Sequence, residues 1–533
     1  MAQAECSPEL IFPEEQELRN LVALLFIFSL AFFASCRRTN TEFVTVALPE
    51  PFTTFDTLTT EKNDAAAERV RNLIFNSLVK KTESFDYTGE LASDIKASDD
   101  GKTITFTLRD NVKFHNGKPF TSADVKYTFD ELFRAKGNKS FAFFDTVNKL
   151  QVPHIVSIET PDARTVVFTI QRPALKNQLL ANLVAIPIIA EGTSPEQKAK
   201  PVGTGPFKFV SFDQSQNTVE LEAFQEYWDT APKIGKLRIK TVTDASALQA
   251  ELETGGVDLA PVPSNLPPDS VKALGTKPNL KVEQFDGSNI QYVGMNTQSP
   301  PLDNPKIRQA IGYAIDREKI IKELLSGQAR IAYSILPAAS WAFSPGTKYD
   351  YDPQRSKELL REAGYKNEPI KFKFASGNAA YNSFVQAIQS SLLDVGLNIE
   401  VEPIDANTLR DQLPRGQFQL NTGVWIGGNQ DPIFMKDLFT TAKIPSPPDV
   451  MCCNRSRYSD PEVDKLLDDA INEVDRAKAK DLYIKAWEKI SRDVPLYPLW
   501  YPSNMVISNK RIGNVKIGPS GDWSFIKDII VNN

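Results

Sequence analysis

Residues 100–133 read DGKTITFTLRDNVKFHNGKPFTSADVKYTFDELF. Across residues 103–108, apolar side chains and threonines alternate strictly, which is the period of a half-buried strand. The dipeptide Asn-Gly at 116–117 is typical of a hairpin turn, because both residues tolerate a positive φ. Thr121 and Asp124 have the spacing of a capping box, so we expect a helix to begin there. This stretch predicts a strand, a turn, a short strand and a capped helix.

Longer patterns extend this stretch and follow it along the chain in a fixed order. They are DGKT at 100–103, VKFHNGKPF at 112–120, PVGTGPF at 201–207, EYW with PK at 226–233, IRQAIGYAIDR at 307–317 and DYDP with LL and AGY at 350–365. This set resembles the signature segments of the family 5 extracellular solute-binding proteins, the peptide- and nickel-type receptors of bacterial ABC importers. The resemblance spans roughly residues 41–510.

The resemblance implies an α/β fold of the two-lobed, periplasmic-binding-protein-like kind. It is type II, in the large three-domain variant, with discontinuous domains joined by hinge strands. The expected limits are a signal peptide with a lipobox at 1–36, domain I at 41–84, 200–279 and 497–533, domain II (an appended lobe) at 85–199, and domain III (the second lobe) at 280–496. Independently, the strand-helix-strand order across 370–404 predicts parallel strands with helices on the faces of the sheet.

Composition narrows the classes of function. The 533 residues carry a formal net charge of −6, from 61 Lys and Arg against 67 Asp and Glu. No basic excess is available to neutralise phosphates, which argues against a nucleic-acid partner. With 10% aromatic and 24% charged residues, the composition is that of an ordinary globular protein.

The N-terminal region indicates export. Residues 21–35 are uncharged and apolar, but they are fewer than the roughly 20 residues that a spanning helix needs. They fit the apolar region of a signal peptide, and FASC at 33–36 resembles a bacterial lipobox, which implies lipidation of Cys36. A plain signal peptide or an anchor helix are the alternatives. Because residues 1–20 carry five acids and one base, we expect translation to start further along.

Metal and cofactor sites are not indicated. Cys452 and Cys453 are adjacent, so they either form a ring disulfide or remain two free thiols in a loop. No Cys/His spacing typical of a metal site occurs, and the two histidines, His115 and His154, do not make one. We interpret His115, in the signature stretch, as a surface or turn residue. We expect no cofactor and no bound metal.

The stretch WIGGNQDP at 425–432 is the strongest candidate for a ligand pocket. It combines an aromatic, small polar groups and an acid, so Trp425, Gly428, Asn429 and Asp431 are the candidate ligand residues. In peptide-binding relatives this motif resembles W-x-x-D-x-x-D-P, whose first Asp pairs with the peptide α-amino group. Gly428 stands at that position here, which weakens the case for peptides with a free N-terminus. The simpler interpretation is that Trp425 is a core residue and Asp431 a helix cap.

Tyr292 and Phe55 are two further candidates, since each is expected at a strand end that faces the cleft. We predict a substrate-binding component of an ABC importer, which captures an oligopeptide or similar extended solute by lobe closure and breaks no bond. The expected partners are the solute and the permease, and the protein is expected to be a lipid-anchored monomer in the periplasm or at the cell surface.

Two alternatives remain open. A secreted hydrolase is the first, but GxSxG and HExxH are absent and two histidines leave almost no general base. We therefore name no catalytic residue. The second is a binding module on the same fold that serves a sensor or acts as a chaperone partner, which the sequence does not separate from import.

Overall fold

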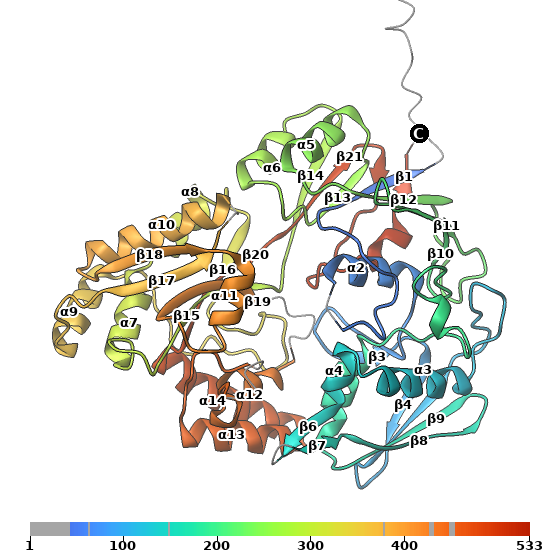
Figure 1. Cartoon of the computed structure of the whole chain (residues 1–533), viewed down its shortest axis with the longest axis horizontal. Coiled ribbons are helices and arrows are strands. Elements are labelled where there is room, and N and C mark those ends of the chain that lie inside the picture. The colour runs from blue at the N-terminus through green and yellow to red at the C-terminus, as the bar shows by residue number, and fades with distance from the viewer. Residues whose placement is uncertain are drawn as a thin grey trace, which may run out of the picture. The chain divides into compact units, whose positions relative to one another are not determined.

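The computed structural model describes residues 43–61, 64–147, 150–376, 379–425, 431–446 and 453–532. Three larger sheets, of seven, six and four strands, organise this part of the chain (Figure 1). We use "first lobe" for residues 43–285 and 504–532 and "second lobe" for residues 290–502.

The seven-stranded sheet of the first lobe has the order β10-β11-β12-β1-β13-β21-β14. Its strands are β1 (Val44–Leu48), β10 (Phe207–Asp213), β11 (Thr218–Ala223), β12 (Lys236–Thr241), β13 (Leu259–Pro261), β14 (Leu280–Phe285) and β21 (Asn504–Asn509). The central strand β1 pairs in parallel with β12 and β13, and all five of its residues are buried. Burial on both faces explains why VTVAL is almost continuously apolar. The accompanying helices are α2 (Ala65–Ile74), α5 (Ala245–Thr254) and α6 (Pro268–Leu274).

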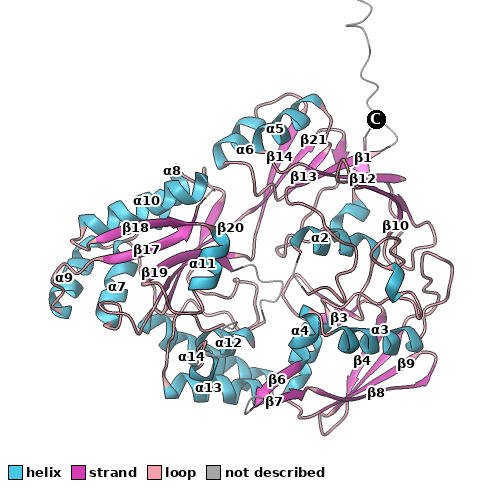
Figure 2. Ribbon diagram, viewed as in Figure 1, coloured by secondary structure: helices cyan, strands magenta, loops and turns pink. Residues whose placement is uncertain are grey.

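The four-stranded antiparallel sheet belongs to the same lobe and contains the signature stretch. Its order is β4 (Ala92–Ala97), β5 (Thr103–Leu108), β9 (Thr165–Ile170) and β8 (Ile155–Asp162). Burial alternates along β5, with Ile104, Phe106 and Leu108 in the core, as predicted. Helix α3 (Ser122–Ala135) begins with the predicted capping box and contacts β8 and β9 (Figure 2). Smaller elements complete this lobe: β2 (Val79–Lys81), β3 (Tyr87–Gly89), β6 (Phe144–Val147), β7 (Leu150–Pro153), α4 (Leu175–Leu183), β22 (Ile512–Gly513), β23 (Ile530–Val531), and the 3₁₀ turns η1 (Asn138–Phe143), η2 (Ser194–Glu196) and η4 (Ser524–Asp528).

His115 is a half-buried turn residue, in line with its interpretation from the sequence, and it also joins the signature stretch to the glycine-rich segment at 203–205. Its ring Nδ1 accepts from the Gly203 amide at 3.3 Å, and its Nε2 donates to the Gly205 carbonyl at 3.0 Å. This pattern requires a neutral imidazole protonated on Nε2. Burial lowers the pKa of His115 to about 4, which keeps the ring neutral. A Cβ on Gly203 would lie 2.0 Å from the Ile74 carbonyl oxygen, so only glycine fits this approach.

The second lobe is built on the six-stranded sheet β16-β20-β15-β19-β17-β18. Its strands are β15 (Ile290–Met295), β16 (Ala329–Ile331), β17 (Ile370–Ala375), β18 (Ile399–Ile404), β19 (Leu420–Trp425) and β20 (Leu496–Pro502). Strand β17 pairs in parallel with β18, as predicted from the strand-helix-strand order. Its helices are α7 (Pro305–Ala314), α8 (Arg317–Glu323), α9 (Pro353–Ala363), α10 (Ala379–Asp394) and α11 (Ala406–Gln412). Asn304 and Asp352 cap α7 and α9, since the side chain of each accepts a hydrogen bond from the first turn of its helix.

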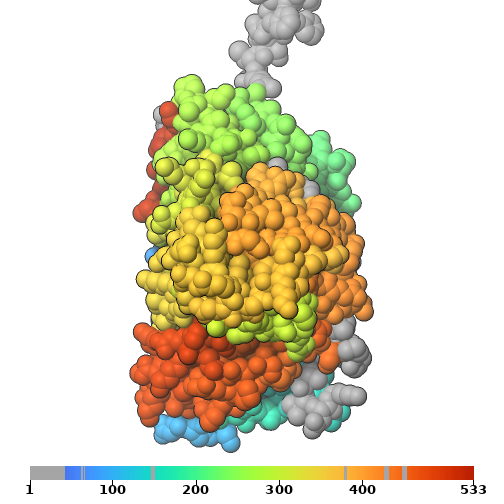
Figure 3. All heavy atoms as spheres, turned by 90° about the vertical axis from the view of Figure 1, so that its left-hand side faces the viewer, coloured from blue at the N-terminus to red at the C-terminus, as the bar shows by residue number. Residues whose placement is uncertain are grey.

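A helical part of the second lobe has its own hydrophobic core. It comprises α12 (Phe434–Phe439), η3 (Thr441–Lys443), α13 (Pro461–Asn472) and α14 (Arg476–Asp493). Trp487 and Phe439 are buried in this core. In Figure 3 the red-orange segment of α13 and α14 lies below the yellow and orange segments of the sheet-bearing part. Among the helices of the described ranges, none is long and apolar enough to cross a membrane.

Two neighbouring strands run from one lobe into the other. Strand β14 pairs with β21 in the seven-stranded sheet, and their continuations β15 and β20 pair in the six-stranded sheet. The chain therefore changes sheets between Phe285 and Ile290, and again at Ser503. The predicted limits at 280 and 497 put β14 and β20 in the wrong sheets, because strand partners that are remote in sequence decide sheet membership. A Cβ on Gly287 would lie 1.9 Å from the Pro502 carbonyl oxygen, so the two crossings touch.

Candidate functional site

Asp431 lies where the two lobes meet. Its Oδ1 accepts from the Ile433 amide at 3.0 Å, which fixes the turn that leads into α12. Its Oδ2 accepts from the phenolic hydroxyl of Tyr87 at 2.9 Å, and Tyr87 belongs to the first lobe. Asp431 is 3% exposed. Asp431 therefore fixes the turn before α12, whose N-cap is Ile433, and it is also a contact between the lobes.

The first-lobe side of this contact is the ribbon of β2 and β3. Arg476, at the start of α14, forms an ion pair with Asp86, next to Tyr87. The guanidinium of Arg476 lies 4.6 Å from the centroid of the Trp341 ring, which in turn packs edge-on against Tyr483. Acidic and phenolic groups of one lobe thus face a guanidinium and a carboxylate of the other.

Burial dominates the electrostatics around Asp431. Desolvation raises the pKa of Asp431, while the Ile433 amide and the Tyr87 hydroxyl lower it. Burial lowers the pKa of Lys81, on β2, to about 8, and the nearby Asp431 partly offsets this. The site therefore holds an acid and a base whose charged forms support one another in a desolvated setting.

Tyr292, a sequence candidate, occupies the middle of the second-lobe sheet. It lies on β15 opposite Gly423 of β19, and its half-buried ring packs against the same core that α12 and α14 contribute to. Burial raises the pKa of its hydroxyl, which Arg455 and Asn421 counteract. A Cβ on Gly423 would lie 3.1 Å from the Tyr292 hydroxyl, so the glycine leaves room for the ring.

A second polar side chain, Gln291, lies on β15 and pairs with Thr422 on the neighbouring strand β19. Gln291 is 2% exposed and donates to the Thr422 hydroxyl at 2.7 Å. It also hydrogen-bonds the hydroxyl of Tyr381, on α10, whose pKa burial raises to about 12. Polar side chains in the centre of a sheet cost free energy unless they are paired. Sequence analysis missed Gln291, although a glutamine inside the apolar run IQYVGM was the available signal.

Phe55 is a core residue in this structure. It is 3% exposed, and its ring centroid lies 4.7 Å from that of Phe52 and 5.0 Å from that of Phe209. Tyr292 packs against the core of α12 and α14, and Asp431 lies in the turn before α12, whereas Phe55 belongs to the first-lobe core. The structure does not bring Phe55 together with them.

Several predicted residues lie outside the described residues. Gly428, Asn429 and Cys36 are among them, as is the side chain of Trp425. The backbone of Trp425 ends β19 and pairs with Ile290. Cys453 is disulfide-bonded, and its partner also lies outside the described residues.

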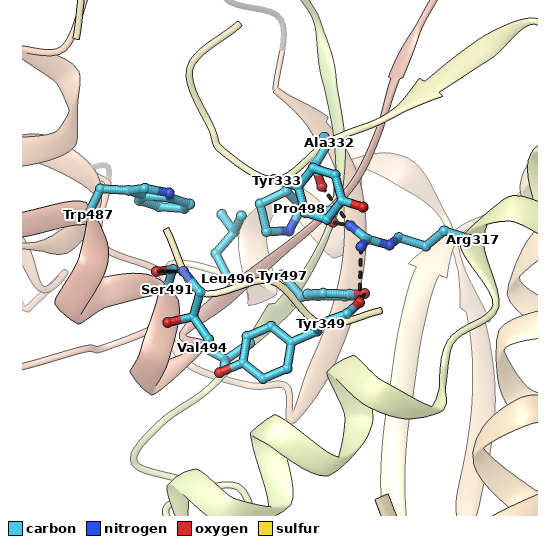
Figure 4. Close-up of a pocket in the computed structure, with 11 residues that line it drawn as sticks. Arg317, Ala332, Tyr333, Tyr349, Trp487, Ser491, Val494, Leu496, Tyr497 and Pro498 are labelled. Atoms are coloured by element: carbon cyan, nitrogen blue, oxygen red, sulfur yellow. Dashed lines mark hydrogen bonds between the residues drawn. The ribbon is translucent and has the colours of Figure 1, made fainter. Parts of the chain in front are cut away.

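Arg317 is one of the residues that line a small cavity in the second lobe (Figure 4). The guanidinium donates to three backbone carbonyls, those of Ala332 at 2.6 Å, Pro498 at 3.0 Å and Tyr349 at 3.0 Å. The Tyr333 and Tyr497 rings lie 4.9 and 5.0 Å from it. These contacts tie the start of α8 to β20 and to the loop before α9, which is a structural role.

Three residues of the contact between the lobes had no signal in the sequence. Asp86 and Tyr87 sit in an ordinary polar turn, and Arg476 reads as a solvated helix residue. Only their meeting across the lobes distinguishes them.

Comparison with known proteins assigns the family. Residues 86–445 match the family model "Bacterial extracellular solute-binding proteins, family 5 Middle". A glutathione-binding protein of Pectobacterium atrosepticum is 30% identical, over 90% of this chain and 92% of that protein. Heme-binding protein A of Haemophilus influenzae is 27% identical, over 85% of this chain and 86% of that protein. The fold matches the solved structure of the oligopeptide-binding protein AppA of Bacillus subtilis in complex with a nonapeptide, with a TM-score of 0.72, 24% identity, and coverage of 92% of this chain and 99% of that one.

The family match spans most of the chain, and the observed two-lobed fold agrees with it. The relatives are substrate-binding transport proteins of the extracellular side. The chain belongs to the family 5 bacterial extracellular solute-binding proteins and is the substrate-binding component of an ABC importer.

Proposed function

We propose that the protein captures a short peptide or peptide-like solute between its lobes and delivers it to a membrane permease. The observation that carries this proposal is the double connection of the lobes. They are joined by the adjacent crossings β14-β15 and β20-β21, and they meet again through Tyr87 and Asp431. Two lobes that hinge at one edge and touch elsewhere can enclose a solute and exclude water from it.

Two of the three proteins compared above have names that support a peptide-like ligand. The relative with 30% identity is named for glutathione, a modified tripeptide. Gly428 removes the carboxylate that pairs with a peptide α-amine in the family motif, and each oxygen of Asp431 already accepts a hydrogen bond. We therefore infer a ligand whose recognition does not depend on a conventional α-amine salt bridge. Trp425, Asn429 and Tyr292 remain the proposed lining of the pocket.

The remaining assignments are also proposals. The protein acts as a monomer, is anchored to the membrane by lipid on Cys36, and catalyses no reaction. Its domain division follows the prediction, with the two crossings moved to 286–289 and 503. The support is the lipobox-like FASC segment and the non-enzymatic character of the named relatives.

Native mass spectrometry of protein purified from its own host tests the proposal, by identifying a co-purified ligand. Calorimetry with reduced glutathione and with trialanine as probes then separates the ligand classes. We expect glutathione to bind at least tenfold more tightly than trialanine. A co-purified mixture of ordinary peptides, with tight trialanine binding, contradicts the inference from Gly428. A co-purified ligand that is not peptide-like contradicts the proposed substrate class.

A further inference from the structure

The turn between β2 and β3 presents two adjacent side chains to the second lobe. Asp86 forms an ion pair with Arg476, and Tyr87 donates to Asp431. The partners are about 390 and 344 positions away in the chain. Both contacts therefore depend entirely on the lobes being together.

The backbone of this turn is held in an unusual conformation. Phe85 has a φ of 61°, a left-handed value that a bulky side chain rarely adopts, and its ring is buried. The turn is closed by hydrogen bonds from the Thr82 amide to the Asp86 carbonyl at 2.8 Å and from the Phe85 amide to the Thr82 carbonyl at 3.0 Å. Such conformations persist where the surroundings over-determine them, often at sites of function. Here the conformation places Asp86 and Tyr87 side by side.

Arg476 occupies a position in α14 that is electrostatically unfavourable for a cation. It is the first residue of α14, directly after the N-cap Asp475. A cation in the first turn is disfavoured by the helix dipole. Arg476 instead stacks over Trp341 and pairs with Asp86 across the lobes. The planar guanidinium suits both contacts, which an ammonium would not make together.

We propose that Asp86 and Tyr87 of the first lobe, with Arg476 and Asp431 of the second, form a latch that stabilises the closed arrangement of the lobes. The latch acts without contacting the ligand and slows ligand release, a consequence that rests on the proposed function. Asp431 is then a closure residue in addition to being part of the candidate pocket stretch at 425–432. Apolar packing supports the same interface, since Ala174 of the first lobe belongs to the core formed with α12 and α14.

Charge reversal with restoration tests the latch. The measurement is the distance distribution between nitroxide labels carried by non-natural amino acids at Val156 and Leu393, which are exposed positions on β8 and α10. Unliganded protein is used, so the result does not depend on knowing the solute. We expect Asp86→Arg or Arg476→Asp to lower the ratio of closed to open molecules about two- to fivefold, the range typical of a partly exposed ion pair. The double variant Asp86→Arg with Arg476→Asp should restore the ratio to within about twofold.

The matched control is Lys306→Glu, opposite Glu362. This pair has similar exposure and lies within the second lobe, so its reversal should leave the ratio unchanged. The latch is overturned if the single reversals match wild type, if the double variant fails to restore the ratio, or if wild type shows no closed component. Failure of the latch with retained peptide binding leaves the proposed function standing, and loss of peptide binding with an intact latch refutes the function alone.

Discussion

The hydroxyl of Tyr87 donates a 2.9 Å hydrogen bond to the Asp431 carboxylate, although the two residues are 344 positions apart. The bond joins the first residue of β3 to the segment that leads into α12, across the two lobes. Because Asp431 is buried, the bond matters more than a surface contact of the same length.

Removing the Tyr87 hydroxyl should therefore destabilise the protein. We expect Tyr87→Phe to lower the free energy of unfolding by about 1–2 kcal/mol, since a buried carboxylate loses a donor. The measurement is urea denaturation followed by fluorescence. Tyr333→Phe is the control, because Tyr333 donates to the exposed Asp350 at a similar 3.0 Å. Equal effects of the two substitutions would contradict a special role for the buried bond.

His115 should make stability depend on pH. Its folded-state pKa of about 4 lies below the ordinary value of 6.5 because of burial, so the unfolded chain binds the proton more readily. The stabilisation is fully present above pH 6.5 and is lost as the pH falls toward 4. We expect His115 to account for a loss of about 1–2 kcal/mol between pH 7 and pH 5.

His115→Gln should flatten that pH dependence. The free energy of unfolding is measured by urea denaturation at both pH values, for wild type and variant. The variant is expected to be less stable at pH 7, because the link to Gly203 and Gly205 is weakened, and to lose less on acidification. An equal loss in both proteins would assign the pH dependence to other groups.

Alanine substitutions at Trp425 and Phe55 should have different effects, the first on ligand affinity and the second on the free energy of unfolding. Trp425→Ala is expected to weaken glutathione binding by at least about 1 kcal/mol, as for an aromatic anchor in a pocket. Phe55→Ala should lower the free energy of unfolding by about 3–5 kcal/mol, because it opens a cavity in an aromatic cluster. The affinity of its folded fraction should stay unchanged. Calorimetry and urea denaturation on both variants give the comparison, and unchanged affinity for Trp425→Ala would remove it from the pocket.

Arg317 should not tolerate lysine. An ammonium cannot reach the three carbonyls that the planar guanidinium satisfies, nor stack between two tyrosine rings. We expect Arg317→Lys to lower the free energy of unfolding by about 2–4 kcal/mol. Arg330→Lys, at the exposed pair with Asp286, is the control and should change it by less than about 0.5 kcal/mol. A small effect at Arg317 would mean that the carbonyls find other donors.

The sequence by itself determined the local elements and the family. The alternation at 103–108 and the capping box at Thr121 are both present in the structure, because each depends on side chains within a few positions. The signature segments indicated the family because each is a short contiguous pattern that can be read directly from the sequence.

Tertiary structure alone decided the contacts between remote segments. It determined which sheets β14 and β20 belong to. It also brought His115 within hydrogen-bonding distance of Gly203, and it buried Phe55 in a core rather than beside Tyr292. It also joined Tyr87 to Asp431. Such contacts depend on which surfaces meet after folding, and the identity of each residue carries almost no information about a partner hundreds of positions away. The signature stretch thus indicated the family, whereas the contact between the lobes showed where the candidate site lies.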